Sequence, residues 1–467
     1  MGVELRRARE EFGLTRTAAV DALGLGVGVF AGEGSFRPRL AQHVVFVGAQ
    51  DVAPVGLGLG GRVVVSGRVG GAGGGREVRH AQENTTRKTG HSHGATYSGA
   101  MADLHLDCPA PDGSVRSVRI SSPDRVLWPD SGITKGELAT YIRDLGQAFL
   151  DRVGGRPMTL QRFPTGIEGE EFYSKNPPRG VPAYVRTVTM TYPSGRKHPQ
   201  LVIDEIAAAV WAVQMNTITF HPWPVTASAD PDAVDHPDEV RIDLDPQPGR
   251  GFADAVTAAL LLREVLGEVG LTGFAKSSGN RGLHVYVPIT PTREFLDVRH
   301  GVIAIARELE RRAPDLATTA WWKEQRGQRV FVDYNQACRD RTIAAAYSPR
   351  PLPGAPVSMP LAWHDLESVD PRDFTVRTVL DVLAGRDDPW SEYPTARADL
   401  GQAMQWWERD VADGLPELAF PPDYPKMPGE PPRVQPSRQR YADDEYEPGG
   451  VGYLRQHPEL PPRVAPS

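Results

Sequence analysis

The chain of 467 residues has little lysine, little cysteine and no long apolar run, and each shortage excludes a class of protein. Arginine supplies 45 of the 52 basic residues, and none of the seven lysines begins the Lys-x-Asp-Gly motif of a nucleotidyl-lysine site. Two cysteines, Cys108 and Cys338, exclude a disulfide scaffold and a four-cysteine zinc site, and they fit a reducing cytosol. No run of 18 apolar residues is present, which excludes an ordinary transmembrane helix.

The overall charge is mildly acidic but unevenly distributed. The formal charge is −7, which argues against a protein that coats nucleic acid, although a local basic groove is compatible with it. Residues 1–100 carry 12 basic and 8 acidic residues and hold 21 of the 48 glycines, so the remainder of the chain is net −11. Such a glycine-rich segment buries too little apolar surface to offset chain entropy. We therefore expect residues 1–100 to be disordered, either as spurious upstream translation before a true start at Met101 or as a flexible arm.

Residues 101–392 carry regular hydrophobic periodicity and are predicted to form the folded domain. Thr134 and Glu137 read as a helix capping box, and Asp204 as the cap of a second helix over residues 205–215. Strands are predicted at 240–245, 283–287 and 330–334, and helices at 252–269 and 293–312. Alternating strands and helices indicate an α/β fold. The proline-rich segment 393–467 is predicted to be a largely disordered tail.

The first chemical motif is Asp-x-Asp within a predicted strand. Because side chains alternate along a strand, Arg241, Asp243 and Asp245 share one face and the apolar residues between them share the other. Two carboxylates at this spacing can converge on one Mg²⁺ or Mn²⁺, which prefer oxygen ligands. Taken alone the motif is weak, because surface acids on an edge strand give the same pattern.

Two further motifs follow along the chain. Residues 277–286 place glycines beside polar donors before a strand that carries His284, and such a turn can hold phosphate oxygens while Arg281 grips them. An ordinary glycine-rich hairpin is the alternative. Asp333 lies in an apolar run, where burial requires a partner for its charge. A metal ion or an arginine could supply that partner.

In this order, the three motifs resemble the archaeo-eukaryotic primase superfamily, and within it the polymerase domain of bacterial ATP-dependent DNA ligase D in a stand-alone form. Further matches lie at residues 124–129, 134–136, 172–175, 219–223 and 347–350. The resemblance covers about residues 115–390. It implies a primase-polymerase core with a mixed or antiparallel sheet, and a second α/β lobe, divided at about 115–225 and 226–392.

The resemblance also implies site residues. Asp243, Asp245 and Asp333 would be the catalytic metal ligands for two divalent ions, Mn²⁺ or Mg²⁺. Arg125 and Lys135 would bind a DNA 5′ phosphate, although residue 125 is commonly lysine in the family, and an arginine binds with the geometry of a planar fork. The implied nucleotide-binding residues are Lys175, His221, Ser278, Gly279, Arg281, His284, Lys323, Arg326, Gln336 and Arg350.

The function expected from this resemblance is DNA-dependent nucleotidyl transfer. A primer end at a gap or a 3′ overhang with a 5′ phosphate would be extended with NTPs or dNTPs, ribonucleotides being preferred, in repair such as non-homologous end joining. A bacterial, cytoplasmic, nucleoid-associated monomer without a membrane partner is expected. The sequence leaves open whether Ku and a separate DNA ligase are partners. The alternatives are a non-catalytic DNA-end-bridging module and a metal-dependent glycosyltransferase.

Overall fold

The computed structural model describes residues 27–28, 46–47, 102–228 and 230–435. The chain divides into two compact units, residues 1–96 and 97–467. In the first unit, β1 (Val27–Gly28) pairs antiparallel with β2 (Phe46–Val47). The predicted disorder of residues 1–100 and the proposed start at Met101 otherwise fall outside the described residues, as does the tail segment 436–467.

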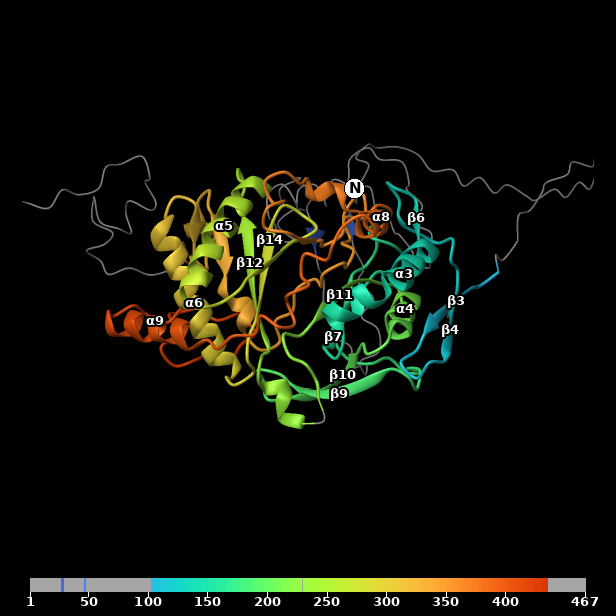
Figure 1. The fold of residues 1–467 in the computed structure, drawn as a ribbon, viewed down its shortest axis with the longest axis horizontal. Helices are drawn as coiled ribbons and strands as arrows, with labels where there is room; N and C mark the ends of the chain where they lie inside the picture. Colours follow the sequence, from blue (N-terminus) through green and yellow to red (C-terminus); the bar gives the residue numbers. More distant parts are fainter. Residues whose placement is uncertain (1–26, 29–45, 48–101, 229, 436–467) are drawn as a thin grey trace, which may run out of the picture. The chain divides into compact units, whose positions relative to one another are not determined.

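The N-terminal lobe of the second unit is built on an antiparallel sheet with the strand order β11-β7-β10-β9, and β8 pairs with β7. Two helices, α3 and α4, contact each other and pack beside this sheet (Figure 1). A hairpin of β3 and β4 and the short pair β5 and β6 complete the lobe. The bounds of the elements are β3 Leu104–Pro109, β4 Val115–Ile120, β5 Val126–Trp128, β6 Ile133–Thr134, α3 Lys135–Val153, β7 Pro157–Arg162, β8 Phe172–Ser174, β9 Arg186–Thr191, β10 Lys197–Val202, α4 Ile206–Gln214 and β11 Thr217–Pro222.

The C-terminal lobe contains a six-stranded mixed sheet of order β15-β16-β12-β14-β13-β17, in which the β15–β16 pair is parallel and the others are antiparallel. Helices α5 and α6 contact β12 and lie together on one side of it (Figure 1). The bounds are β12 Glu239–Pro246, α5 Phe252–Glu268, β13 Phe274–Ser277, β14 Leu283–Pro288, α6 Phe295–Arg312, β15 Ala317–Thr318, α7 Lys323–Arg326, β16 Val330–Asp333, β17 Pro360–Leu361 and α8 Val379–Ala384. The predicted α/β class with a mixed sheet is confirmed.

The two predicted helix starts have different outcomes. Thr134 caps α3: its side chain accepts from the Glu137 amide, and the Glu137 carboxylate accepts from the Thr134 amide. The prediction for Asp204 is wrong, because Glu205 is the N-cap of α4 and makes no side-chain cap bond. Asp204 instead pairs with Arg186, with Nε 2.6 Å from Oδ2. A distant arginine thus competes with the local backbone for this carboxylate.

The folded part extends past residue 392, where the sequence pattern was expected to fade. Helix α9 (Gly401–Ala412) packs against α6, and Trp407 stacks on His300 with ring centroids 4.1 Å apart. Beyond it, Glu417 binds both Arg299 and His300 at 2.7 Å. Leu400, Ala403, Met404 and Trp407 recur at helical spacing and lie in or against the core, so α9 has an apolar face that the sequence analysis missed.

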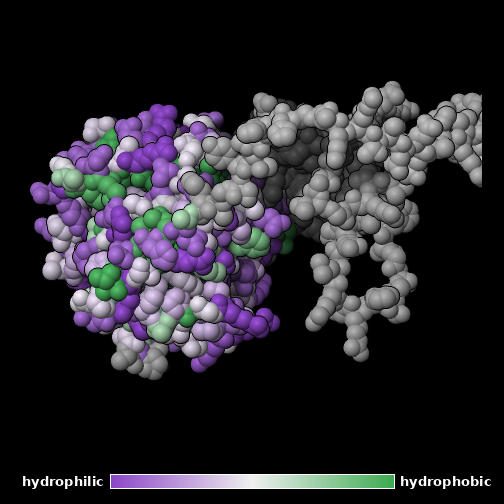
Figure 2. All heavy atoms as spheres, turned by 90° about the vertical axis from the view of Figure 1, so that its right-hand side faces the viewer, coloured by the Kyte–Doolittle hydropathy of each residue, from purple (hydrophilic) through white to green (hydrophobic). Residues whose placement is uncertain are grey.

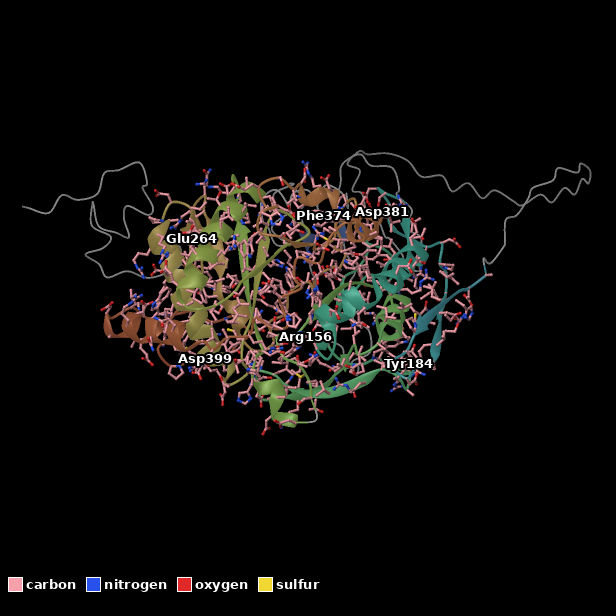
Figure 3. All side chains as sticks on the ribbon, in the orientation of Figure 1. Arg156, Tyr184, Glu264, Phe374, Asp381 and Asp399 are labelled. Atoms are coloured by element: carbon pink, nitrogen blue, oxygen red, sulfur yellow. The ribbon has the colours of Figure 1, made fainter. Side chains whose placement is uncertain are left out.

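Buried ion pairs connect the lobes at the start of β12. Arg156, which precedes β7, lies 2.7 Å from Asp238 and 2.9 Å from Glu239 and is placed between the lobes in Figure 3. The main hydrophobic core includes buried residues of both lobes, so they form a continuous interior. The face in Figure 2 is mostly hydrophilic, with apolar residues in small separate groups. No described helix is both long and apolar enough to cross a membrane.

Candidate active site

A single row of side chains crosses four strands of the C-terminal sheet. Asp333 on β16 lies opposite Asp243 on β12, Asp243 lies opposite His284 on β14, and His284 lies opposite Lys276 on β13. Residues paired in this way on adjacent strands point to the same face and lie within interaction distance. The register therefore joins three of the predicted residues and adds Lys276, which the sequence analysis did not identify.

The carboxylates of this row lie close enough together to affect one another electrostatically. Burial, followed by the charges of Asp333 and Asp245, raises the pKa of Asp243 to about 8. Burial also raises the pKa of Asp333, against hydrogen bonds from the Asn335 amide (2.9 Å) and the Gln336 side chain (3.1 Å). This mutual repulsion is what a bound cation would relieve, and the donors are the oxygen ligands that Mg²⁺ and Mn²⁺ prefer.

The acids share an electrostatic environment but do not converge as a finished ligand cluster. Among the described residues, no three His, Cys, Asp or Glu side chains are grouped so as to hold a metal ion. Gln247 donates to the Asp245 carboxylate at 3.2 Å, and Gln336 holds Asp333 in a similar way. By donor type and charge, the acidic residues nevertheless fit a divalent cation.

The His284 ring has a contact at each of its two nitrogens, and its surroundings favour the neutral form. Burial and the nearby cations Lys276 and Arg350 hold its pKa well below the usual range. Its Nε2 lies 3.5 Å from Asp243 Oδ1, and its Nδ1 lies 2.8 Å from the Lys276 amine. The imidazole thus bridges a buried amine and the carboxylate row.

The turn between β13 and β14 is held by the side chain of Ser278 and contains Gly279. Ser278 Oγ accepts from the amides of Asn280 and Gly282 at 3.2 and 3.1 Å. Gly279 has φ +71°, and a Cβ there would lie 2.5 Å from Arg350 Cγ. Glycine is therefore required at 279 for both conformation and space. Arg281 is exposed at the rim of a cavity of about 710 Å³ lined also by Phe252, Pro356 and Pro371.

Arg350 lies against this turn. Its Nε is buried and has no hydrogen-bond partner among the described residues, and burial lowers its pKa. Its charge acts on Asp243, His221 and His284, which places the guanidinium in the same site. A buried donor without a partner carries a free-energy penalty that an anionic ligand would remove.

The N-terminal lobe contributes a second wall. Burial, followed by Arg350 and Lys276, lowers the pKa of His221 to about 3, so the ring is neutral. Its Nε2 lies 3.0 Å from Gln161 Oε1, and Gln161 Nε2 donates to Glu171 at 2.7 Å. Lys175 is bound by both oxygens of Asp340, at 2.8 and 2.6 Å. Gln161, Glu171 and Asp340 are contacts that no sequence motif indicated.

Two of the predicted nucleotide ligands have structural contacts here, and a third, Lys323, is exposed. Arg326 donates to the carbonyls of Ala320 and Trp321 and lies 3.5 Å above the centre of the Phe331 ring, which is a structural role. Gln336 is engaged by Asp333, and Lys323 is exposed on α7. Spacing alone could not show that carbonyl groups would occupy donors of Arg326.

The predicted pair Arg125 and Lys135 lies in the N-terminal lobe. Lys135 is 2% exposed, and its amine donates to Ser121 O at 3.2 Å and Gln214 Oε1 at 2.9 Å. Burial, and then the charge of Arg125, lowers the pKa of Lys135 to about 8. Arg125 donates to Pro164 O and Asn216 Oδ1. Neither side chain has a carboxylate partner among the described ion pairs; both donate to neutral oxygens.

The row of acids, the glycine turn and Arg350 together form the candidate site of this fold. Residues 134–390 match the family described as the LigD primase-polymerase domain, and the chain belongs to this family. It is therefore an enzyme of the nucleotidyltransferase class.

Individual relatives agree with the family. The chain is 34% identical over 294 residues to the multifunctional non-homologous end joining protein LigD of Pseudomonas aeruginosa, covering 62% of this chain and 34% of that protein. It is 28% identical over 279 residues to the bifunctional LigD of Bacillus subtilis, covering 59% and 44%. The solved polymerase domain of Mycobacterium tuberculosis ligase D in complex with DNA superposes with a TM-score of 0.55 at 27% identity, covering 59% of this chain and 97% of that domain. The chain thus spans between a third and a half of the full-length LigD proteins it matches.

Proposed function

We propose that the protein extends the 3′ end of a DNA primer at a gap or broken end by metal-dependent nucleotidyl transfer. The observation that carries this proposal is the row of Asp333, Asp243 and His284 across three strands, on which the charge of Arg350 acts, with the buried Arg350 Nε lacking a partner among the described residues. One wall of the site is rich in carboxylates and the other is cationic. This is the arrangement that a cation-bound triphosphate needs.

Asp243, Asp245 and Asp333 are the residues that would hold two divalent ions, Mg²⁺ or Mn²⁺. When bound, such ions stabilise the attacking and leaving oxygens of a phosphoryl transfer. The protein contributes position and fixed charge rather than covalent chemistry. The raised pKa of Asp243 supports this assignment, since a cation would restore the ionised form that burial and its acidic neighbours disfavour.

The nucleotide would bind with its phosphates on the 278–281 turn. Ser278 and Gly279 supply the turn, Arg281 and Arg350 supply charge, and His284 supplies a ring nitrogen beside Asp243. On the opposite wall, neutral His221 and the Lys175 amine would face the sugar. A contact there with a 2′ hydroxyl would favour ribonucleotides. Lys323 and Gln336 remain proposed contacts around the phosphates and primer, whereas Arg326 would act mainly by supporting the fold.

The 5′ phosphate across the gap would bind at Arg125 and Lys135. The Lys135 ammonium donates to two neutral oxygens, so no carboxylate of the described residues neutralises its positive charge. That charge would attract an external anion. The M. tuberculosis polymerase domain was solved with DNA, which supports DNA as the ligand.

The cellular role we propose is repair of DNA ends in the bacterial cytoplasm, by analogy with relatives named for non-homologous end joining. Ku and a separate DNA ligase are proposed as partners for that role. The protein itself would act as a monomer.

A primer-extension assay tests the proposal. The substrate is a duplex with a short gap bearing a 5′ phosphate, supplied with Mn²⁺ or Mg²⁺ and with ribo- or deoxyribonucleotides. We expect extension that requires metal and is faster with ribonucleotides. Binding of the gapped DNA without extension under any of these conditions would favour a non-catalytic bridging module. Loss of both binding and extension would contradict the proposal altogether.

A further inference from the structure

Lys276 is a buried lysine that the proposed chemistry does not yet use. Its side chain is fully buried on β13, and no carboxylate forms an ion pair with it among the described residues. Burial, followed by the charge of Arg350, holds its pKa well below the usual range. Burying an amine without an acid is costly, so its contacts need a reason.

The contacts of Lys276 form a directional hydrogen-bond network. The hydroxyl of Ser358 donates to Ser277 O at 2.6 Å, so its oxygen is the acceptor for the Lys276 amine. The same amine lies 2.8 Å from His284 Nδ1 and 5.4 Å from the centre of the Tyr286 ring. An ammonium or amine carries at least two N–H groups, enough for Ser358 and His284 together.

The other end of the ring decides which nitrogen of His284 carries the proton. Nε2 lies 3.5 Å from Asp243 Oδ1. With a divalent cation bound, Asp243 would be ionised; a bare Nε2 would then set its lone pair against that carboxylate, whereas a protonated Nε2 would attract it. A neutral ring with Nε2–H leaves Nδ1 bare, and the bare Nδ1 accepts from Lys276. Both ends of the ring therefore favour the same tautomer.

We propose that Lys276 is a positioning residue that fixes His284 as the Nε2–H tautomer, so that the ring presents a fixed N–H donor to the carboxylate row and the reacting phosphates. The inference rests on the proposed nucleotidyl transfer and adds to it a residue that acts through His284. Such supporting hydrogen bonds set the tautomer and orientation of functional histidines in other proteins.

The tautomer can be measured directly in the wild-type protein with Mg²⁺ present, so that Asp243 is in its ionised form. Imidazole ¹⁵N NMR spectra, with the His284 signal assigned by its absence in His284→Ala, distinguish a bare Nδ1 from a protonated one. We expect a bare Nδ1 and a protonated Nε2. A protonated Nδ1 in the wild-type protein would overturn the inference without reference to any variant.

Kinetics provide a second test that a merely structural role would not satisfy. Lys276→Met keeps the length and volume of the side chain and removes both donors. We expect kcat for extension to fall about 10- to 100-fold, as for other groups that orient a functional histidine, with DNA affinity unchanged. Lys426→Met, at an exposed lysine, is the matched control and should extend as the wild type does.

A double-mutant cycle separates the inference from general destabilisation. If Lys276 acts through His284, Lys276→Met should cost nothing further in the His284→Ala background. Equal, additive losses in both backgrounds would contradict the inference. A wild-type enzyme that fails to extend any primer would instead contradict the proposed function, and the NMR result would still decide the tautomer.

Discussion

Two buried lysines show how the same residue serves two regions of this protein differently. Lys276 and Lys135 are both almost inaccessible, both have a lowered pKa, and neither forms a described ion pair with an acid. The amine of Lys276 contacts His284, which lies beside Asp243 of β12. The amine of Lys135 donates to a backbone carbonyl and to a side-chain amide oxygen. The first arrangement is the one we propose to orient another side chain. The second is the one we propose to bind an incoming anion.

The largest expected effect comes from removing the proposed catalytic carboxylate beside His284. Asp243→Asn removes the central carboxylate of the row while keeping its size. Because groups that only support a metal ligand cost about 10- to 100-fold, loss of the ligand itself should slow single-turnover extension by more than about 100-fold. Affinity for the phosphorylated gap should not change. Asp413→Asn, at an exposed aspartate, is the control; comparable activity in the two variants would remove Asp243 from the site.

The next largest effect concerns Lys135 and the proposed recognition of the DNA 5′ phosphate. Lys135→Met should reduce the preference for a 5′-phosphorylated gap by at least about tenfold, because hydrogen bonds to charged groups contribute about 1.5–3 kcal/mol. Extension of primers without the opposing phosphate should stay within about twofold. The measurement is the ratio of dissociation constants for gaps with and without the phosphate. An unchanged ratio would contradict the assignment.

The same lysine predicts a pH dependence. With its pKa lowered to about 8 in the folded protein, Lys135 is charged at pH 7 and loses its proton as pH rises through about 8. Bound phosphate favours the charged form, so the phosphate preference should decline between about pH 7 and 9. Lys135→Arg, which stays charged, should show a flat profile. A flat profile in the wild type would show that this amine does not contact the phosphate.

A smaller effect tests the turn that lies between the two walls of the site. Gly279→Ala must accommodate φ +71° and a Cβ 2.5 Å from Arg350 Cγ. Because the clash would displace Arg350 from the site, we expect the nucleotide KM to rise about five- to thirtyfold, which corresponds to about 1–2 kcal/mol of binding free energy. Gly113→Ala has φ +79° and nothing within 4 Å, so it carries the backbone cost without the clash. Equal KM values in the two variants would show that Arg350 does not contribute to nucleotide binding.

The smallest effect concerns stability alone. Thr134→Ala removes the capping-box acceptor of α3 and should lower the free energy of unfolding by about 1 kcal/mol. Chemical denaturation measures this change, and Thr257→Ala, at an exposed position inside α5, is the control. Extension by folded protein should be unchanged. A loss of phosphate preference would show that the cap also positions the neighbouring Lys135.

The sequence predicted what local patterns determine. The strand of Asp243, the glycine turn and the α3 cap follow from alternation, turn chemistry and capping, which act over a few residues. Lys276 could not be found in this way, because its role depends on strand register and on Ser358, 82 residues away. The same reason explains Arg326, whose donors are taken by carbonyls of a neighbouring turn, and Asp204, whose partner lies on β9.

The most direct test compares one variant from each of the two regions in a single experiment. Asp243→Asn and Lys135→Met are each assayed for extension and for phosphate-dependent DNA binding on the same gapped duplex. We predict that Asp243→Asn binds the phosphorylated gap as the wild type does but fails to extend it, and that Lys135→Met extends primers but does not distinguish the phosphate. Loss of both properties in each variant would contradict the claim that catalysis and DNA-end recognition are performed by separate regions.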